Sequence, residues 1–137
     1  YKSGTLKAVG IRDGKAVCVS ELKTAGKPIK LVINPEKTVV SPEGVVHVEV
    51  VLVDAKGNRV TNDDRKLQFQ LEGNGEILGL SNGDMTCHDP FSQTDSKTTS
   101  KGKCLCILKT GKEIGDLKLT VEAEGLKTSM INIQVEN

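Results

Sequence analysis

Carboxylates are the most numerous side chains here that could do acid–base chemistry, with 18 Asp and Glu among 137 residues. Two carboxyl groups that act together across a bond must share one pocket, and the acid of the pair needs a raised pKa. In this chain they occupy polar positions of alternating segments, such as Glu49 and Glu122, or turns, such as Asp13, Asp54 and Asp64. We therefore expect no catalytic residue in this chain.

The cysteines are the next candidates, because thiolates bind metals and form disulfides. There are four, at Cys18, Cys87, Cys104 and Cys106. Two residues that are two apart on a strand point to the same face, and neighbours placed in this way rarely bridge. The C-x-C spacing is also a poor match to the C-x₂₋₄-C pairs of zinc sites. We expect unbridged thiols that are buried as small hydrophobic side chains.

A polar segment, Asn82, Asp84, His88 and Asp89, offers the only other set of metal-ligand types. Its spacing does not follow the calcium loop of EF-hands, and Asn and Asp in such loops usually bond their own backbone. His47 lies in a strand pattern, where a structural role is more common than metal binding. The glycine-rich stretches 73–75 and 82–84 precede no helix that could hold a phosphate. We assign no metal ligand and no cofactor.

Composition excludes several classes of partner. Nineteen Lys and Arg against 18 acidic residues give a net charge of +1, so no basic surface is available for nucleic acid. No apolar run reaches the ~18–20 residues of a membrane segment. One Tyr, two Phe and no Trp leave few rings for stacking a base or a sugar. Sugar binding through polar loops stays open as a minor alternative.

The elements that would position all these residues are strands. Period-2 alternation of apolar and polar residues recurs, and helix patterns are nearly absent. Val46, Val48, Val50 and Leu52 share one face of a long run, 45–53, whose other face is also partly apolar, so this strand should be central. The others are 29–33, 67–71, 76–80, 103–109, 117–123 and 131–135. Residues 28–137 are therefore predicted to form an immunoglobulin-like β-sandwich, with a polar loop over 84–101.

Residues 1–27 form a separate unit in this reading. Tyr1–Gly10 and Ala16–Lys23 alternate around an Asp13-Gly14 turn, which predicts a hairpin. A break rich in small residues and proline follows at 24–28. The chain begins in a strand, without an initiator Met or a secretory leader pattern, so we expect it to be part of a longer protein. The hairpin would be the end of a preceding domain.

Five stretches together resemble the region after the barrel in β-galactosidase-like family 2 glycoside hydrolases of bacteria. They are residues 1–15 (YKSGTLKAVGIRDGK), 22–28 (LKTAGKP), 51–60 (VLVDAKGNRV), 71–84 (LEGNGEILGLSNGD) and 102–108 (GKCLCIL). Asp89-Pro90-Phe91 stands where the family usually has a Glu. The resemblance implies a retaining glycosidase as parent, whose catalytic carboxylates lie in the barrel and match no position here. It also implies a periplasmic or secreted parent, although the chain itself carries no targeting information.

Two functions remain as hypotheses. The first is a non-catalytic structural module of a glycoside hydrolase, whose partners are the catalytic barrel and neighbouring domains of the parent chain, or another subunit. The alternative is an independent immunoglobulin-like adhesion or binding module of a bacterial cell surface. Such modules occur as tandem repeats, and residues 1–24 do not resemble residues 29–137. This favours the first hypothesis.

Overall fold

The computed structural model describes residues 3–137, and this part of the chain consists of strands and loops without a helix. The predicted all-β class is confirmed. Within the described residues there is accordingly no helix of the length and hydrophobicity needed to cross a bilayer. The strands are β1 (Thr5–Arg12), β2 (Lys15–Lys23), β3 (Lys30–Pro35), β4 (Val39–Val40), β5 (Val45–Val53), β6 (Lys66–Glu72), β7 (Gly75–Ser81), β8 (Ser96–Thr98), β9 (Lys103–Thr110), β10 (Gly115–Ala123) and β11 (Ser129–Val135).

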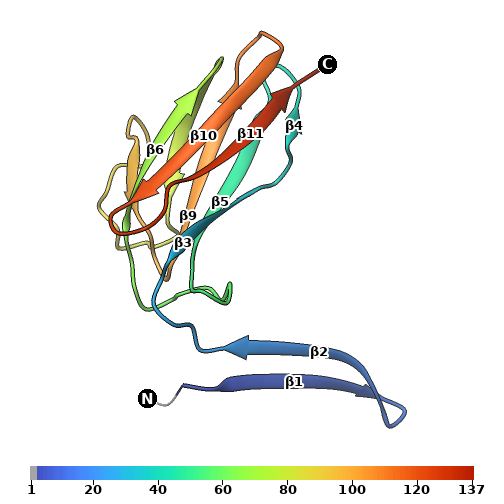
Figure 1. Cartoon of the computed structure of the whole chain (residues 1–137). Coiled ribbons are helices and arrows are strands. Elements are labelled where there is room, and N and C mark those ends of the chain that lie inside the picture. Colours follow the sequence, from blue (N-terminus) through green and yellow to red (C-terminus); the bar gives the residue numbers. More distant parts are fainter. Residues whose placement is uncertain (1–2) are drawn as a thin grey trace.

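Nine of these strands form a two-layer sandwich (Figure 1). One sheet has the order β4-β11-β10-β6-β8 and the other the order β3-β5-β9-β7. Neighbouring strands are antiparallel except β4 and β11, which run parallel. Two mainly antiparallel sheets packed face to face are the arrangement that the alternation of the sequence predicts.

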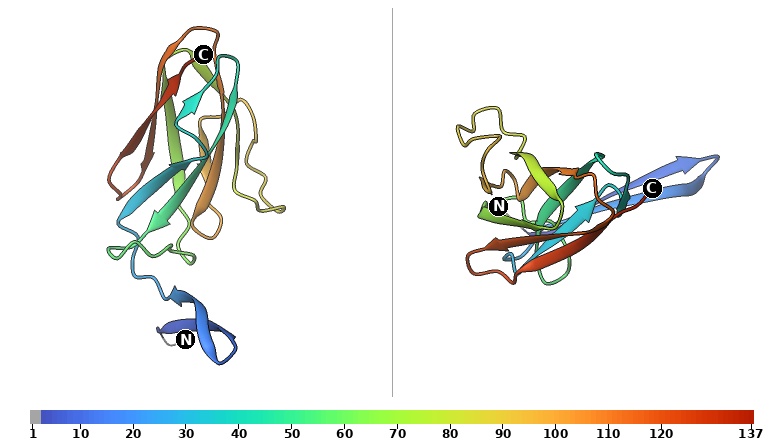
Figure 2. Two further views of the ribbon diagram at one scale, coloured as in Figure 1. Left: turned by 90° about the vertical axis from the view of Figure 1, so that its right-hand side faces the viewer. Right: turned by 90° about the horizontal axis from the view of Figure 1, so that it is seen from above.

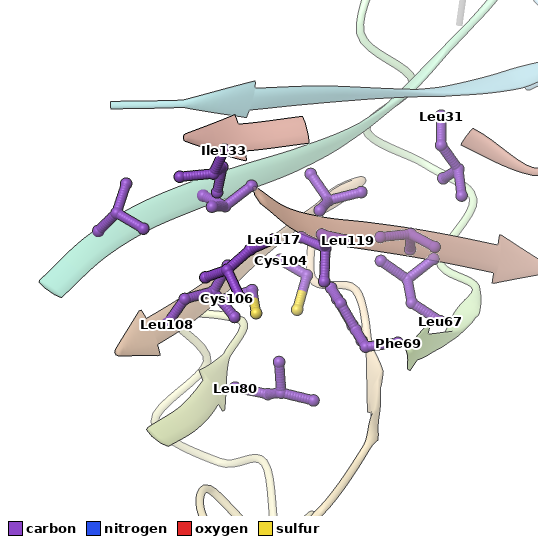
Figure 3. Packing of buried hydrophobic residues seen from close by; sticks show 14 of the residues in the cluster. Leu31, Leu67, Phe69, Leu80, Cys104, Cys106, Leu108, Leu117, Leu119 and Ile133 are labelled. Atoms are coloured by element: carbon purple, nitrogen blue, oxygen red, sulfur yellow. The ribbon is translucent and has the colours of Figure 1, made fainter. Parts of the chain in front are cut away.

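The core lies between the two sheets and is built from the alternating faces. Val46, Val48, Val50 and Leu52 of β5 have no exposed surface, and β5 is an inner strand between β3 and β9, as predicted. From the other sheet, β10 and β11 bury side chains that include Leu117, Leu119, Val121, Ile133 and Val135. Figure 3 shows Leu117 and Leu119 of β10 in the same core cluster as Cys104 and Cys106 of β9.

Two features of the sandwich differ from the sequence prediction. The turn at Asp54–Asn58 forms, but it does not connect a hairpin: beyond a single bridge between Val53 and Arg59, the chain crosses to β6 in the opposite sheet. The strands β4 and β8 were not anticipated, because two or three residues are too few to display a period. β8 lies inside the predicted polar loop 84–101.

The hairpin β1–β2 forms a sheet of its own that projects away from the sandwich (Figures 1 and 2). Its turn is Asp13-Gly14, where both residues have positive φ, as in a tight hairpin turn. β1 begins at Thr5 rather than at Tyr1, and the first two residues of the predicted strand lie outside the described part. Every residue of β2 is exposed, and only Gly10 of β1 is not.

Candidate functional site

The carboxylates considered above as candidates for acid–base catalysis lie on different strands and loops, and they stabilise the structure around them. Glu49 pairs with Lys103 on the outer face of the β5–β9 sheet, and the carboxylate of Glu122 accepts a hydrogen bond from Thr128. The carboxylate of Asp64 accepts hydrogen bonds from the Thr99 hydroxyl at 3.0 Å and from the Gly102 amide at 2.8 Å. The fold brings no two of the predicted candidates to a common pocket.

Three carboxyl groups have a perturbed pKa, and all three are lowered. A hydrogen bond to His47 lowers the pKa of Glu36, and hydrogen bonds from Thr86 lower that of Asp84. Backbone and side-chain N–H groups, led by the Gly26 amide, hold the pKa of Asp54 far below its usual range. A general acid needs the opposite shift, so the direction at these sites suits structural carboxylates.

The segment 82–89 forms Asx-turns of the predicted kind. The Asp84 amide donates to Asn82 Oδ1 at 3.0 Å, and the Thr86 amide and hydroxyl donate to Asp84 Oδ1 at 2.9 and 2.7 Å. In the range 3–137, no three His, Cys, Asp or Glu side chains gather as metal ligands would. The oxygen atoms Asn82 Oδ1 and Asp84 Oδ1 therefore accept hydrogen bonds from within the segment, whereas Asp89 Oδ2 accepts from the Thr98 amide at 3.4 Å.

Two side chains that the sequence analysis missed help to attach the rest of this loop to the sandwich, beside backbone hydrogen bonds to Leu80 and Phe69. Lys97 is buried, and its ammonium donates to the carbonyls of Asp89 and Pro90 at 2.8 and 3.3 Å. The Phe91 ring packs where a side chain at Gly79 would stand, so this close approach requires glycine. Lys97 follows the polar residues of a loop, and nothing in its sequence context signals burial.

The cysteines fall into two environments. Cys104 and Cys106 are buried on one face of β9, and burial raises the pKa of each thiol to about 12, as expected for inert core residues. All four are free, which fits the prediction of unbridged thiols. The prediction of burial is wrong for Cys18, which is exposed, because the hairpin that carries it has no core of its own. Cys87 is half-buried.

His47 is on the surface, where its Nδ1 lies 3.1 Å from Glu36 Oε2. Its side chain is half exposed, and its ring pairs with a single carboxylate. Its place on the outer face of β5 beside Glu49 agrees with the predicted alternation. The pair joins the loop after β3 to β5, which is a structural role.

The hairpin exposes many large apolar side chains for its size. Six large apolar side chains on it are exposed: Leu6, Val9, Ile11, Val17, Val19 and Leu22. Leu6 and Leu22 face each other across the two strands, as do Val9 and Val19. Since residues at odd and even positions point to opposite sides, both faces of the ribbon are apolar. Two-stranded ribbons are marginal by themselves, and such a surface is typical of a contact with another domain.

A groove separates the base of the hairpin from the sandwich. It has a volume of ≈ 970 Å³ and is lined by Leu6 and Leu22 on the hairpin side and by Arg59, Thr61 and Asn62 on the sandwich side. The leucine side chains therefore do not bury themselves on the sandwich. The hairpin and this groove form the candidate interaction site.

Comparisons with known proteins give matches to the sandwich and to the hairpin. The family model described as glycoside hydrolase family 2 C-terminal domain 5 matches residues 29–132. The β-galactosidase BoGH2A of Bacteroides ovatus is 31% identical over 138 residues, which cover 99% of this chain and 16% of that protein. The chain thus spans about a sixth of the length of this curated relative.

Two solved structures are similar over nearly the whole chain. A family 2 glycosyl hydrolase from Bacteroides cellulosilyticus aligns with a TM-score of 0.93 and 27% identity, covering 100% of this chain and 18% of that one. A β-glycosidase from Bacteroides vulgatus aligns with a TM-score of 0.92 and 28% identity, covering 98% of this chain and 18% of that one. The family match extends over most of the sandwich and the structural matches include the hairpin. The chain belongs to the family of C-terminal domains 5 of family 2 glycoside hydrolases.

Proposed function

We propose that this chain is a non-catalytic accessory module of a β-galactosidase-like family 2 glycosidase. The parent would hydrolyse O-glycosidic bonds with retention, using carboxylates that lie in its catalytic barrel. The observation that carries the proposal is the hairpin: a ribbon with apolar residues on both faces and no core, in a chain that spans 16–18% of similar proteins. In the parent, the hairpin would complete the preceding domain.

The carboxylates support the non-catalytic part of the proposal. A retaining glycosidase needs two carboxyl groups ~5–5.5 Å apart, and the acid among them needs a raised pKa. In this chain the pKa values of Glu36, Asp54 and Asp84 are lowered, and these three residues lie on separate loops. These carboxylates accept hydrogen bonds that stabilise their own turns or join neighbouring segments.

The hairpin register indicates how the two faces would be used. Leu6 and Leu22 line the groove toward the sandwich, whereas Val9 and Val19 point to the other side. The register shifts between Gly10 and Ile11, so Val17 has no partner on β1 and the simple alternation does not assign it to the face of Val19. We propose that the valine face packs into the core of the preceding domain, and that the leucine pair lies at the contact between that domain and the sandwich.

An activity assay tests the non-catalytic claim. The purified chain should not hydrolyse nitrophenyl β-galactoside above the buffer rate, and calorimetric titration with galactose or lactose should show no binding at millimolar sugar. The full-length parent is the positive control for hydrolysis. Measurable turnover by the chain would contradict the non-catalytic assignment, and millimolar binding would support the polar-loop alternative for sugar.

A matched pair of truncations tests the role of the hairpin. Ile11 and Ile114 are 70% and 62% exposed in this chain, so Ile11→Ala and Ile114→Ala should each change its free energy of unfolding by less than ~0.5 kcal/mol. If Ile11 is buried in the preceding domain of the parent, its truncation there should cost about 2–5 kcal/mol. Ile114, on the sandwich between β9 and β10, is the control in both proteins. Equal small effects of Ile11→Ala in both would refute the packing of the hairpin.

A further inference from the structure

Residues 24–29, between the hairpin and the sandwich, have the composition of a flexible linker, but four of the six make a hydrogen bond or pack against the core. The Thr24 amide donates to the Gly4 carbonyl at 2.9 Å, and the Thr24 hydroxyl accepts from the Gly4 amide at 3.0 Å. Ala25 packs against the hydrophobic core of the sandwich. The Gly26 amide donates to Asp54 Oδ2 at 2.9 Å. The first half of the segment is thus fixed to the hairpin at one end and to the sandwich at the other.

The second half is held where it enters β3. The ring of Pro28 restricts its own φ, and the Ile29 amide donates to the Val53 carbonyl at 3.0 Å. Lys30 then starts the pairing of β3 with β5 opposite Val53. Flexible linkers owe their freedom to residues without such partners. The composition of this segment suggests a flexible backbone, but its hydrogen bonds restrict that motion.

Asp54 is prepared for its part in this contact by its own turn. Its Oδ1 accepts from the amides of Lys56 and Asn58 at 2.9 and 2.8 Å, and its Oδ2 accepts from Asn58 Nδ2 at 3.1 Å. The residue is 4% exposed. The turn holds the carboxylate by hydrogen bonds that do not involve the linker, so the Gly26 amide donates to a fixed, charged acceptor. Hydrogen bonds to charged acceptors are shorter and stronger than neutral ones.

We propose that residues 24–29 form a rigid joint, in which the Asp54 carboxylate holds the linker at Gly26 and so sets one angle between the hairpin and the sandwich. The groove at the base of the hairpin supports this assignment, because the exposed leucines there show that side-chain packing between the two bodies does not set the angle. The inference for the isolated chain stands without the proposed function. That the joint also orients the preceding domain of the parent rests on the proposed function.

Two substitutions at Gly26 separate the hydrogen bond from other changes at the site. Gly26→Pro removes the N–H that donates to Asp54, and its ring carbon takes the place of that hydrogen, which forces the linker and the carboxylate apart. Gly26→Ala keeps the N–H, and its added Cβ would lie 3.7 Å from Asp54 Oδ2, an ordinary contact. Asp54→Asn provides a second test from the acceptor side, since its amide group cannot accept at both positions.

The measurement is made by NMR on the 15N-labelled chain. In the wild type and in Gly26→Ala, we expect the amide of residue 26 to be protected from exchange and the amides of residues 24–29 to have order parameters near the ~0.85 of rigid backbone. One alignment tensor should then fit the residual dipolar couplings of the hairpin and the sandwich together. In Gly26→Pro and Asp54→Asn, the order parameters of the linker should fall toward ~0.6 or below, and two tensors should be needed. Cross-strand contacts between β5 and β9 verify that the sandwich stays folded.

Two results would overturn the inference. One is a wild-type linker that exchanges freely, or a wild-type hairpin whose couplings do not fit the tensor of the sandwich. The other is a Gly26→Pro variant with the same linker order and the same single tensor as the wild type. Neither result bears on the proposed function, which depends on the Ile11→Ala comparison in the parent protein.

Discussion

Gly102→Ala tests how closely the crossing of the chain between the two sheets is packed. Gly102 lies before β9 with a φ of +71°, and a Cβ there would overlap the carbonyl oxygen of Val60. Its amide donates to Asp64 at 2.8 Å, and its carbonyl accepts from the Leu52 amide at 2.9 Å. The Val60 amide in turn donates to the Leu52 carbonyl at 2.9 Å. A side chain at Gly102 must therefore displace the backbone that these three hydrogen bonds hold.

The magnitude follows from two contributions. A non-glycine residue in the left-handed region costs about 1–2 kcal/mol. Displacing Val60 weakens or breaks up to three hydrogen bonds, each with a net contribution of about 1 kcal/mol. We expect Gly102→Ala to lower the free energy of unfolding by about 4 kcal/mol in total. For a domain of this size, that corresponds to a fall in Tm of about 12–16 °C.

Gly57→Ala is the matched control for this prediction. Gly57 has a φ of +82°, and nothing lies within 4 Å of a Cβ added there. Only the conformational cost applies, so the loss should be about 1–2 kcal/mol. Urea titration and thermal unfolding followed by circular dichroism measure both variants. If the two alanine variants lose the same stability, the close approach of Gly102 to Val60 does not hold and the reasoning is refuted.

Three further predictions concern titratable groups and the loop 82–95. Because burial raises the pKa of Cys104 and Cys106 to about 12, Ellman's reagent at pH 7 should modify the exposed Cys18 readily and these two thiols only after denaturation. In the unfolded chain a thiol titrates near ~8.5, so the free energy of unfolding should also fall as pH rises above that value. Folding lowers the pKa of Asp54, so the stabilisation by its carboxylate is complete above the unfolded value of ~4 and is lost as pH falls. Asp54→Asn should therefore be less stable than the wild type at pH 7 and should show a smaller drop in Tm between pH 7 and pH 3. Equal drops in Tm would contradict this. Phe91→Ala should ease local opening of the loop by ~1 kcal/mol, which is about a fivefold faster proteolytic cleavage within 82–95 at an unchanged Tm of the sandwich; unchanged cleavage would show that the ring does not hold the loop.

The candidate site shows where prediction from sequence reached its limit. The hairpin and its turn at Asp13-Gly14 follow from alternation and turn residues. That both of its faces stay exposed does not, because exposure depends on what lies in space around a strand. The segment 24–28 was predicted as a simple break, because its composition contains no sign of an acceptor 28 residues later at Asp54.

Alternation in the sequence was sufficient to locate the principal strands and their buried faces, because side chains on a strand point to alternate sides and one side must leave water. It identified Val46, Val48 and Val50 as core residues. Tertiary structure alone decided which sheet each strand joins, that the chain leaves its sheet after Asp54, that Lys97 is buried, and that the linker is held. Each of these depends on contacts between residues far apart in the chain, which are specified by the packing of the sheets and not by any local pattern.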